Sequence, residues 1–183
     1  LLGSSAIGGT INIITKEPLR NSGELSHTLT SLGCTGALDN NTTLNASLVT
    51  DDRKAGITLY GQSRLRDAYD HDGDGFVEIP TIKSQTIGTQ AYIKTSAYNK
   101  LSLDYHVTNE YRRGGDQLDR PPHEAWIAET TDHLINSGGL TFEGTSKDAH
   151  HRYSVFTSAQ ATNRDSYYGA EMNEFAYGKT KGV

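Results

Sequence analysis

The sequence has little of what builds a large soluble core. Its 183 residues include one cysteine, one methionine, one tryptophan and four phenylalanines, and only 34% are hydrophobic. The lone Cys34 allows neither an internal disulfide nor a cysteine metal cluster. No stretch approaches 18 apolar residues, which excludes a transmembrane helix. The net charge of −5 and the lack of a basic stripe argue against nucleic-acid binding.

The start of the chain also lacks the signs of a leader. Residues 1–9, LLGSSAIGG, have neither a charged beginning nor a long apolar stretch, and no initiator methionine precedes them. The sequence therefore indicates an internal piece of a longer protein, with a processed mature terminus as the alternative.

Alternation of apolar and polar residues with a period of two is the main pattern present, and it predicts β-strands. It is clearest in residues 54–66 and 100–112. The apolar parity carries Ile57, Leu59, Leu65, Leu101, Leu103, Tyr105, Val107 and Tyr111. The other parity is dense in Arg, Asp, Glu and His, which a water-filled barrel lumen tolerates. A soluble sandwich would show the same alternation with its apolar face inward.

The expected strands are long, and the connections between them alternate in length. We expect strands near residues 10–16, 22–33, 41–51, 55–67, 83–97, 100–112, 127–143 and 150–164. Short turns alternate with longer segments at 67–82, at 113–126 and in a tail from about 165, although the loop at 34–40 is short. Short turns at one end and long loops at the other are typical of outer-membrane barrels. The fold class predicted is therefore all-β, a fragment of a large antiparallel transmembrane β-barrel.

The opening residues 1–16, LLGSSAIGGTINIITK, combine a glycine-rich turn with a β-branched strand. A phosphate-binding loop is the first alternative, because Gly3, Gly8 and Thr10 match G-x-x-x-x-G-x-T. The lysine position is Gly9, however, and a strand rather than a helix follows, so the phosphate would have no anchor.

This opening stretch resembles the end of the plug domain of TonB-dependent outer-membrane receptors, a run of the form YGS-x-A-x-G-G-x-I-N-I-I-T-K. Leu2 stands in place of the usual tyrosine, and the signature positions are Gly3, Ser4, Gly8, Gly9 and Asn12. The resemblance implies that residues 1–18 are the C-terminal end of a plug domain, and that residues 10–16 form its last strand. Residues 19–183 would then begin the barrel, with about seven strands.

The same resemblance implies a location and an activity. Such receptors lie in the outer membrane of Gram-negative bacteria and take up scarce bulky nutrients, among them corrinoids and ferric siderophores. The inner-membrane TonB-ExbB-ExbD complex supplies the energy by pulling on the N-terminal part of the plug. No catalytic constellation occurs in the sequence, so we expect a receptor and not an enzyme.

An acidic segment at residues 66–80 begins like a calcium-binding EF-hand loop. Asp70, Asp72 and Asp74 alternate and precede Gly75, but the twelfth position is Thr81 and no helix flanks the segment. Glu78 adds a fourth carboxylate, and such a loop repels itself unless a cation neutralises it. We expect calcium as the cofactor, with a solvated turn and no ion as the alternative. The segment is similar to the acidic loop of cobalamin receptors within the TonB-dependent family.

A second candidate loop lies at residues 112–126, where Gly114-Gly115 is expected to break the strand. Arg113, Asp116, His123 and Trp126 are candidate ligand contacts, since arginine and aromatic residues are frequent anchors. The alternative is a loop that packs on the plug or on its neighbours, with Arg112 paired to Asp116.

Two other functions fit parts of the sequence. A passive porin-like barrel would keep the strands without a plug, and a soluble calcium-binding β-sandwich could act in adhesion. An incomplete barrel exposes two unpaired strand edges, so we expect residues 1–183 alone not to fold as a stable soluble monomer.

Overall fold

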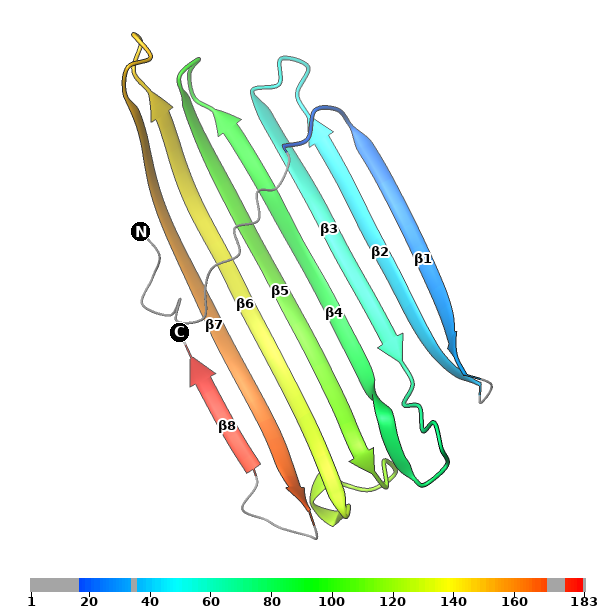
Figure 1. Cartoon of the computed structure of the whole chain (residues 1–183). Coiled ribbons are helices and arrows are strands. Elements are labelled where there is room, and N and C mark those ends of the chain that lie inside the picture. Colours follow the sequence, from blue (N-terminus) through cyan, green and yellow to red (C-terminus); the bar gives the residue numbers. More distant parts are fainter. Residues whose placement is uncertain (1–16, 34–35, 171–176, 183) are drawn as a thin grey trace.

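The part of the chain that the structure describes is a single antiparallel sheet of eight strands that follow one another in chain order (Figure 1). The computed structural model describes residues 17–33, 36–170 and 177–182. The strands are β1 (Ser22–Leu32), β2 (Ala37–Val49), β3 (Ala55–Arg66), β4 (Phe76–Lys94), β5 (Asn99–Asp116), β6 (Ile127–Thr145), β7 (Arg152–Ala170) and β8 (Tyr177–Gly182), and a short 3₁₀-helix η1 spans Pro122–Glu124. The all-β prediction is confirmed. Within these described residues, no helix is long and apolar enough to cross a membrane.

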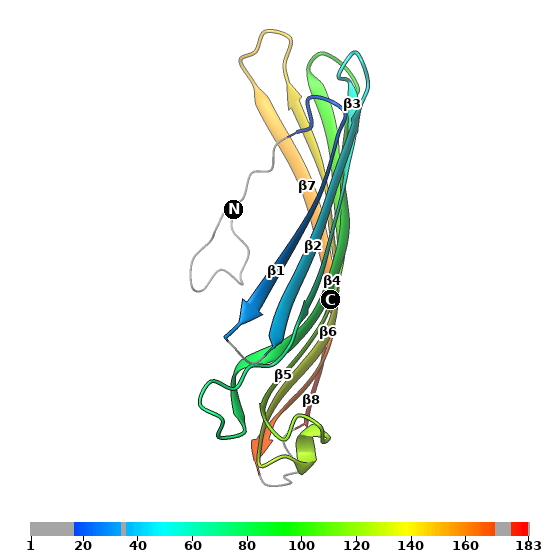
Figure 2. The ribbon, with the colours of Figure 1, turned by 90° about the vertical axis from the view of Figure 1, so that its right-hand side faces the viewer.

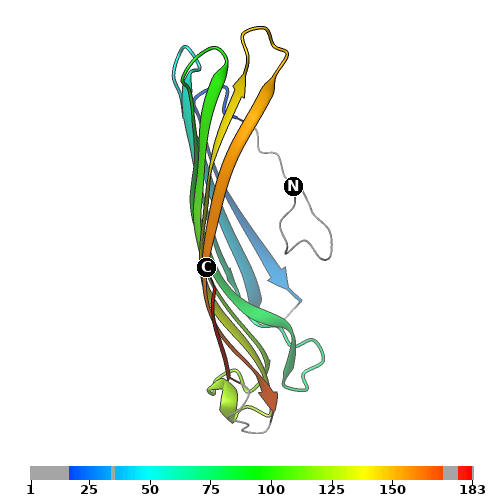
Figure 3. The same ribbon diagram turned by 90° about the vertical axis from the view of Figure 1, so that its left-hand side faces the viewer.

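Seen from its edges, the sheet is one curved layer with a concave and a convex side (Figures 2 and 3). In the described part of the chain, no second layer covers either side. Residues 17–21, which lead into β1, lie on the concave side, where Glu17 contacts Lys100 of β5. The parity of Lys100 therefore faces the concave side.

The register of the strands brings the apolar parity of β2 to β6 onto the convex side. Leu48, Ile57, Ala91, Leu103 and Leu140 are consecutive partners across β2 to β6. Because side chains alternate along a strand, these residues share one face. The large side chains of this face are exposed, for example 50% at Leu59 and 68% at Ile87. The predicted apolar rows of β3 and β5 thus belong to one continuous band.

The apolar band has limits along the strands. On β5 it runs from Leu101 to Val107, about 20 Å at ~3.3 Å per residue. Toward the longer loops, a polar row of register partners interrupts the same face across β2 to β5, formed by Thr42, Ser63, Gln85 and Asn109. Apolar residues such as Leu65 and Tyr111 recur beyond this row, so the apolar belt is followed by a mixed extension.

Several strand ends differ from the prediction. β4 begins at Phe76 instead of 83, because the register shift between Val77 and Thr81 hides its alternation. β5 continues through Gly114-Gly115 to Asp116, and β7 continues to Ala170. β8 lies in the segment predicted as a tail, so the described sheet has eight strands and not seven. The predicted plug strand at 10–16 lies outside the described residues.

Gly115 shows why the predicted strand break is wrong. It has a φ of +101°, and a Cβ placed on it would overlap the carbonyl oxygen of Ile127 on β6. The glycine lets β5 and β6 stay paired at close approach, since only glycine adopts this conformation without strain.

Substitution of Gly115 by alanine should therefore destabilise the sheet. We expect Gly115→Ala to lower the free energy of unfolding by about 2 kcal/mol or more, because it adds both backbone strain and a steric clash. Urea unfolding in detergent, followed by far-ultraviolet circular dichroism, measures this. Gly23→Ala is the matched control, because no atom lies within 4 Å of the added Cβ; equal effects of the two substitutions would contradict the explanation.

Candidate functional site

The acidic loop between β3 and β4 is closed at its base by a short backbone bridge. Tyr69 and Ile79 exchange two hydrogen bonds, of 2.9 Å and 3.1 Å. The loop beyond this bridge lies on the concave side of the sheet (Figure 2). Its ends are thus fixed by the sheet, while its tip turns toward the polar face.

The four predicted metal ligands converge within this loop. Asp70, Asp72, Asp74 and Glu78 each offer one oxygen, and these oxygens all lie within 4.8 Å of one another. Glu78 comes from β4 and accepts a hydrogen bond of 2.6 Å from the backbone N–H of His71, which ties the two arms of the loop together. The sequence-predicted carboxylates are therefore brought together.

Asp70 organises the turn that carries the other carboxylates. Its Oδ1 accepts the N–H of Gly73 at 2.6 Å and its Oδ2 accepts the N–H of Gly75 at 2.8 Å. Both glycines have positive φ, +78° and +91°, which glycine adopts readily. The backbone hydrogen bonds of Gly75 and Gly73 hold the pKa of the Asp70 carboxyl below its ordinary value, so it is ionised at neutral pH.

The geometry suits a hard divalent cation. Calcium takes six to eight oxygen ligands, and four converging carboxylates provide a strongly negative site. The site departs from an EF-hand as the sequence predicted: Thr81 lies within β4, and Glu78 supplies the additional carboxylate. The residues present fit calcium by charge and donor type.

The loop at residues 117–126 lies on the opposite side of the sheet. It carries η1 to the convex side (Figures 2 and 3). Ala125 of the loop packs with Ala128 of β6 and Tyr167 of β7, and all three are almost fully buried. The four predicted ligand contacts of this loop are therefore not assembled with the acidic loop.

The individual side chains of this loop have different surroundings. Arg113 is only 4% exposed, and its guanidinium donates to the carbonyls of Gly114 and Asp116. The Asp116 carboxylate accepts the N–H of Ile127 at 3.0 Å. Arg112 pairs with Glu110 at 2.7 Å, so the alternative pairing with Asp116 is wrong.

His123 and Trp126 complete the set. His123 lies in η1, with its Nε2 3.8 Å from Glu124, and Trp126 is 67% exposed. The position of Arg113 on the convex side could have been predicted from the sequence. Arg113 has the same odd parity as Leu101 to Tyr111, and this parity faces the convex side.

An arginine network on the concave side was not predicted as a site. Arg64 binds Asp39 with two hydrogen bonds of 3.0 Å and 2.6 Å. Glu110 contacts both Arg112 and His133, and Arg66 donates to the carbonyl of Pro80 at 3.0 Å. The polar parity of β3 and β5 predicted these side chains, but the partners Asp39, Pro80 and His133 lie on other strands. The network gives the concave wall an excess of guanidinium groups near the acidic loop.

Comparisons with known proteins identify no relative. No family model, no curated protein and no solved structure matches the chain. The signature positions Gly3, Ser4, Gly8, Gly9 and Asn12 lie outside the described residues. The family resemblance therefore stays a prediction from the sequence.

The hydrogen bonds of Asp70 predict how the loop responds to acid. The folded-state pKa lies below the unfolded value of about 3.9, so the loop is fully stabilised above about pH 4. This stabilisation is lost as pH falls through the lower folded-state pKa. Amide hydrogen-exchange protection factors at Gly73 and Gly75, measured against pH, should show this profile.

Asp70→Asn should give low protection factors at both amides at every pH, because the charge-assisted bonds are weakened. Asp51→Asn, in the exposed turn after β2, is the control and should keep the parent profile. A parent-like profile in Asp70→Asn would contradict this role of Asp70.

Proposed function

We propose that the chain is part of an outer-membrane β-barrel receptor of a Gram-negative bacterium. It takes up a scarce bulky nutrient, of the corrinoid or ferric siderophore class, with energy from the TonB-ExbB-ExbD complex. The observation that carries the membrane part of this proposal is the exposed apolar band on the convex side, opposite a polar concave side.

The band continues across neighbouring strands, which is unusual for a surface in water. Its exposed members include Leu44, Leu48, Leu59, Ile87 and Leu103, spread over β2 to β5. Full burial of one such side chain contributes about 1.5–3 kcal/mol. Contiguous apolar patches beyond a few hundred Å² mark surfaces that contact a partner or a membrane. Lipid hydrocarbon supplies that cover along the whole belt.

The concave side has the chemistry of a wet lumen. It carries ion pairs and hydrogen-bonded polar pairs, such as Arg64 with Asp39 and Ser47 with Thr58. A β-sandwich requires a second sheet over the apolar face. The described residues provide none, which favours the barrel over the soluble adhesion module.

The receptor and the passive porin-like barrel differ in what fills the lumen. The resemblance of residues 1–16 to a plug ending supports the receptor. The position of Glu17 supports it too, because the chain enters β1 from over the concave side.

Lipid contact at defined positions tests the membrane assignment. We expect an environment-sensitive fluorophore on cysteines at Leu59 and Leu103 to be quenched several-fold more by brominated lipids than one at Thr58 and Ser102. These are neighbouring positions of opposite parity, and Cys34→Ser provides the background. Equal quenching at the four positions would overturn the barrel assignment.

We further propose that calcium binds the acidic loop and orders it near the ligand. The loop lies at the end of the concave side where the longer connections gather, beside the arginine network. A divalent cation would remove the repulsion among Asp70, Asp72, Asp74 and Glu78.

Calcium affinity tests this role. Asp72→Ala and Asp74→Ala should each raise the calcium Kd at least about tenfold, a loss of about 1.4 kcal/mol, in titration calorimetry. Asp51→Ala is the control and should leave the Kd unchanged. Labelled corrinoid and ferric siderophores, titrated with and without calcium, then test the ligand class. Unchanged calcium affinity in both loop variants would reject the metal site.

A further inference from the structure

Three arginine side chains gather on the concave side near the acidic loop, toward the ends of β3 and β5. Arg64 and Arg66 are two positions apart on β3, so they share a face, with their Cα atoms about 7 Å apart. Ile82 of β4 is the register partner of both Arg66 and Arg112 of β5. This places the two arginines about 10 Å apart across the sheet. Three guanidinium groups thus belong to one small area of the concave wall.

Two of the three guanidinium groups have a carboxylate partner, and the third has none. Arg64 binds both oxygens of Asp39, and Arg112 pairs with Glu110 at 2.7 Å. Among the residues that the structure describes, no carboxylate forms an ion pair with Arg66. Arg66 is therefore the uncompensated cation of the group.

The surroundings of Arg66 favour an anion at its free edge. Its Nε donates to the carbonyl of Pro80 at 3.0 Å, and within the described part of the chain its two terminal nitrogens donate to no protein atom. The side chain is half-buried beside its register partner Ile82, which is 5% exposed. Water screens a half-buried charge less than an exposed one, so the Arg66 charge acts strongly on a nearby anion.

The other charged groups of this wall do not cancel that attraction. Arg64 and Arg112 both repel the Arg66 charge. Asp39 attracts it, but both oxygens of Asp39 are already bound to Arg64. Glu129 has the concave parity of β6, but β6 lies three strands from β3, about 14 Å away. A bound anion would therefore relieve repulsion that the protein leaves in place.

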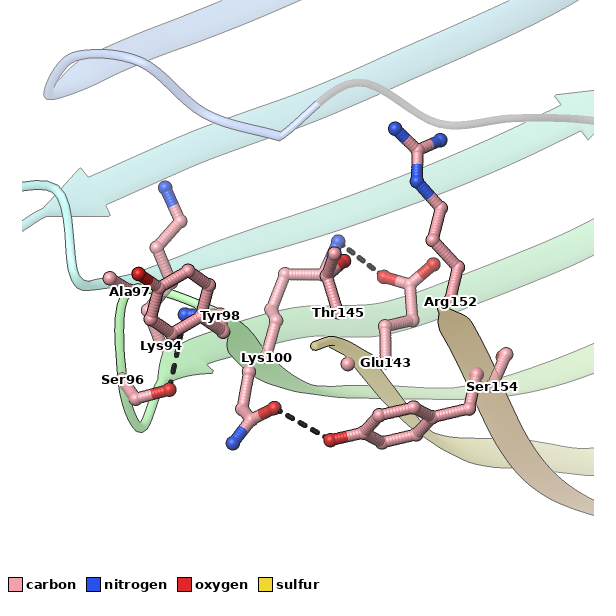
Figure 4. A pocket seen from close by; sticks show the side chains of 12 residues that line it. Lys94, Ser96, Ala97, Tyr98, Lys100, Glu143, Thr145, Arg152 and Ser154 are labelled. Carbon is pink, nitrogen blue, oxygen red and sulfur yellow. Dashed lines mark hydrogen bonds and ion pairs between the residues drawn. The ribbon is translucent and has the colours of Figure 1, made fainter. Parts of the chain in front are cut away.

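The cations at the short-turn end of the concave side have a different environment (Figure 4). Lys100 contacts Glu143 at 2.6 Å, so its charge has a carboxylate partner. Lys94 is exposed and lies over the ring of Tyr92, 5.6 Å from its centroid. A single exposed ammonium group in water gains little from an ion pair. Lys94 is therefore a suitable comparison for Arg66 on the same side of the sheet.

We propose that Arg66 is an anion-binding residue, and that the nutrient taken up by the proposed receptor carries a carboxylate or a phosphate group that the two terminal nitrogens of Arg66 bind. The planar guanidinium presents its N–H groups as a fork that matches two oxygens of either group. Arg64 and Arg112 add to the attraction from a distance. That the anion belongs to a nutrient rests on the proposed function, whereas the anion site depends only on the wall formed by β3 to β5.

Titration of two small anions into the full chain refolded into lipid tests the site. Succinate supplies carboxylates, inorganic phosphate supplies the other group, and calcium-free buffer keeps metal binding out of the measurement. We expect saturable binding, and the anion with the lower Kd shows which group the site prefers. Arg66→Gln should raise this Kd about tenfold or more, because hydrogen bonds to a charged group are lost. Arg66→Lys keeps the charge without the fork and should raise it less.

A second variant should change the affinity in the opposite direction. Asp39→Asn removes a negative charge beside the site and leaves Arg64 uncompensated. We expect the Kd of the preferred anion to fall about two- to fivefold, because one more positive charge acts on it. A purely structural role of Arg66 predicts no such gain in affinity.

Lys94→Met is the matched control, because it removes one positive charge from the concave side about 40 Å from Arg66. It should leave the Kd unchanged. Absence of saturable binding to the parent chain overturns the anion site, as does an unchanged Kd in Arg66→Gln or an equal change in Lys94→Met.

Quenching at Leu59 by brominated lipids reports the proposed membrane function separately. Anion binding without lipid contact keeps the Arg66 site and rejects the receptor, whereas lipid contact without anion binding rejects the Arg66 site alone.

Discussion

Every feature of this protein depends on the register of its backbone hydrogen bonds. Seven antiparallel pairings connect eight strands, and a slip of one residue in any of them would turn the side chains of the following strand to the other side. The pairing stays in phase from Leu48 to Leu140 across five strands. The register shift in β4, between Val77 and Thr81, lies beyond the apolar band. Separation of an apolar and a polar side is thus a property of the register, and both candidate sites inherit their position from it.

The sequence predicted what is local and missed what is not. A period of two is written into each strand, so Leu59 and Leu103 were assigned correctly to one kind of face. The acidic loop was also predictable, since Asp70 and its partners lie within a few positions of one another. The ends of β4 and β7 were not, because alternation is interrupted at a bulge in β4, and tyrosines occupy both parities at the end of β7, at Tyr167 and Tyr168. Turn formers such as Gly114-Gly115 indicate a break only where the neighbouring strand leaves room for one.

The contacts that the sequence did not predict join residues that lie far apart in the chain. Asp39 and Arg64 are 25 positions apart, and only the register between β2 and β3 makes them neighbours. The same holds for Glu17 and Lys100. Arg113 shows the converse case, because a residue that suits ligand binding by type is enclosed by a loop that folds onto the convex side. Residue type suggests chemistry, but the side of the sheet decides whether that chemistry faces a ligand, a membrane or the protein itself.

The free edges of the sheet set a condition that any membrane function must meet. In the described residues, β1 pairs only with β2, and β8 pairs only with β7. Unpaired backbone groups in hydrocarbon cost several kcal/mol each, so a lipid-facing sheet must close on itself or on further strands. A passive channel and a gated receptor would share this requirement. The channel and the receptor differ only in what lies on the concave side. The contact of Glu17 with Lys100 shows that the segment before β1 lies across part of the concave side.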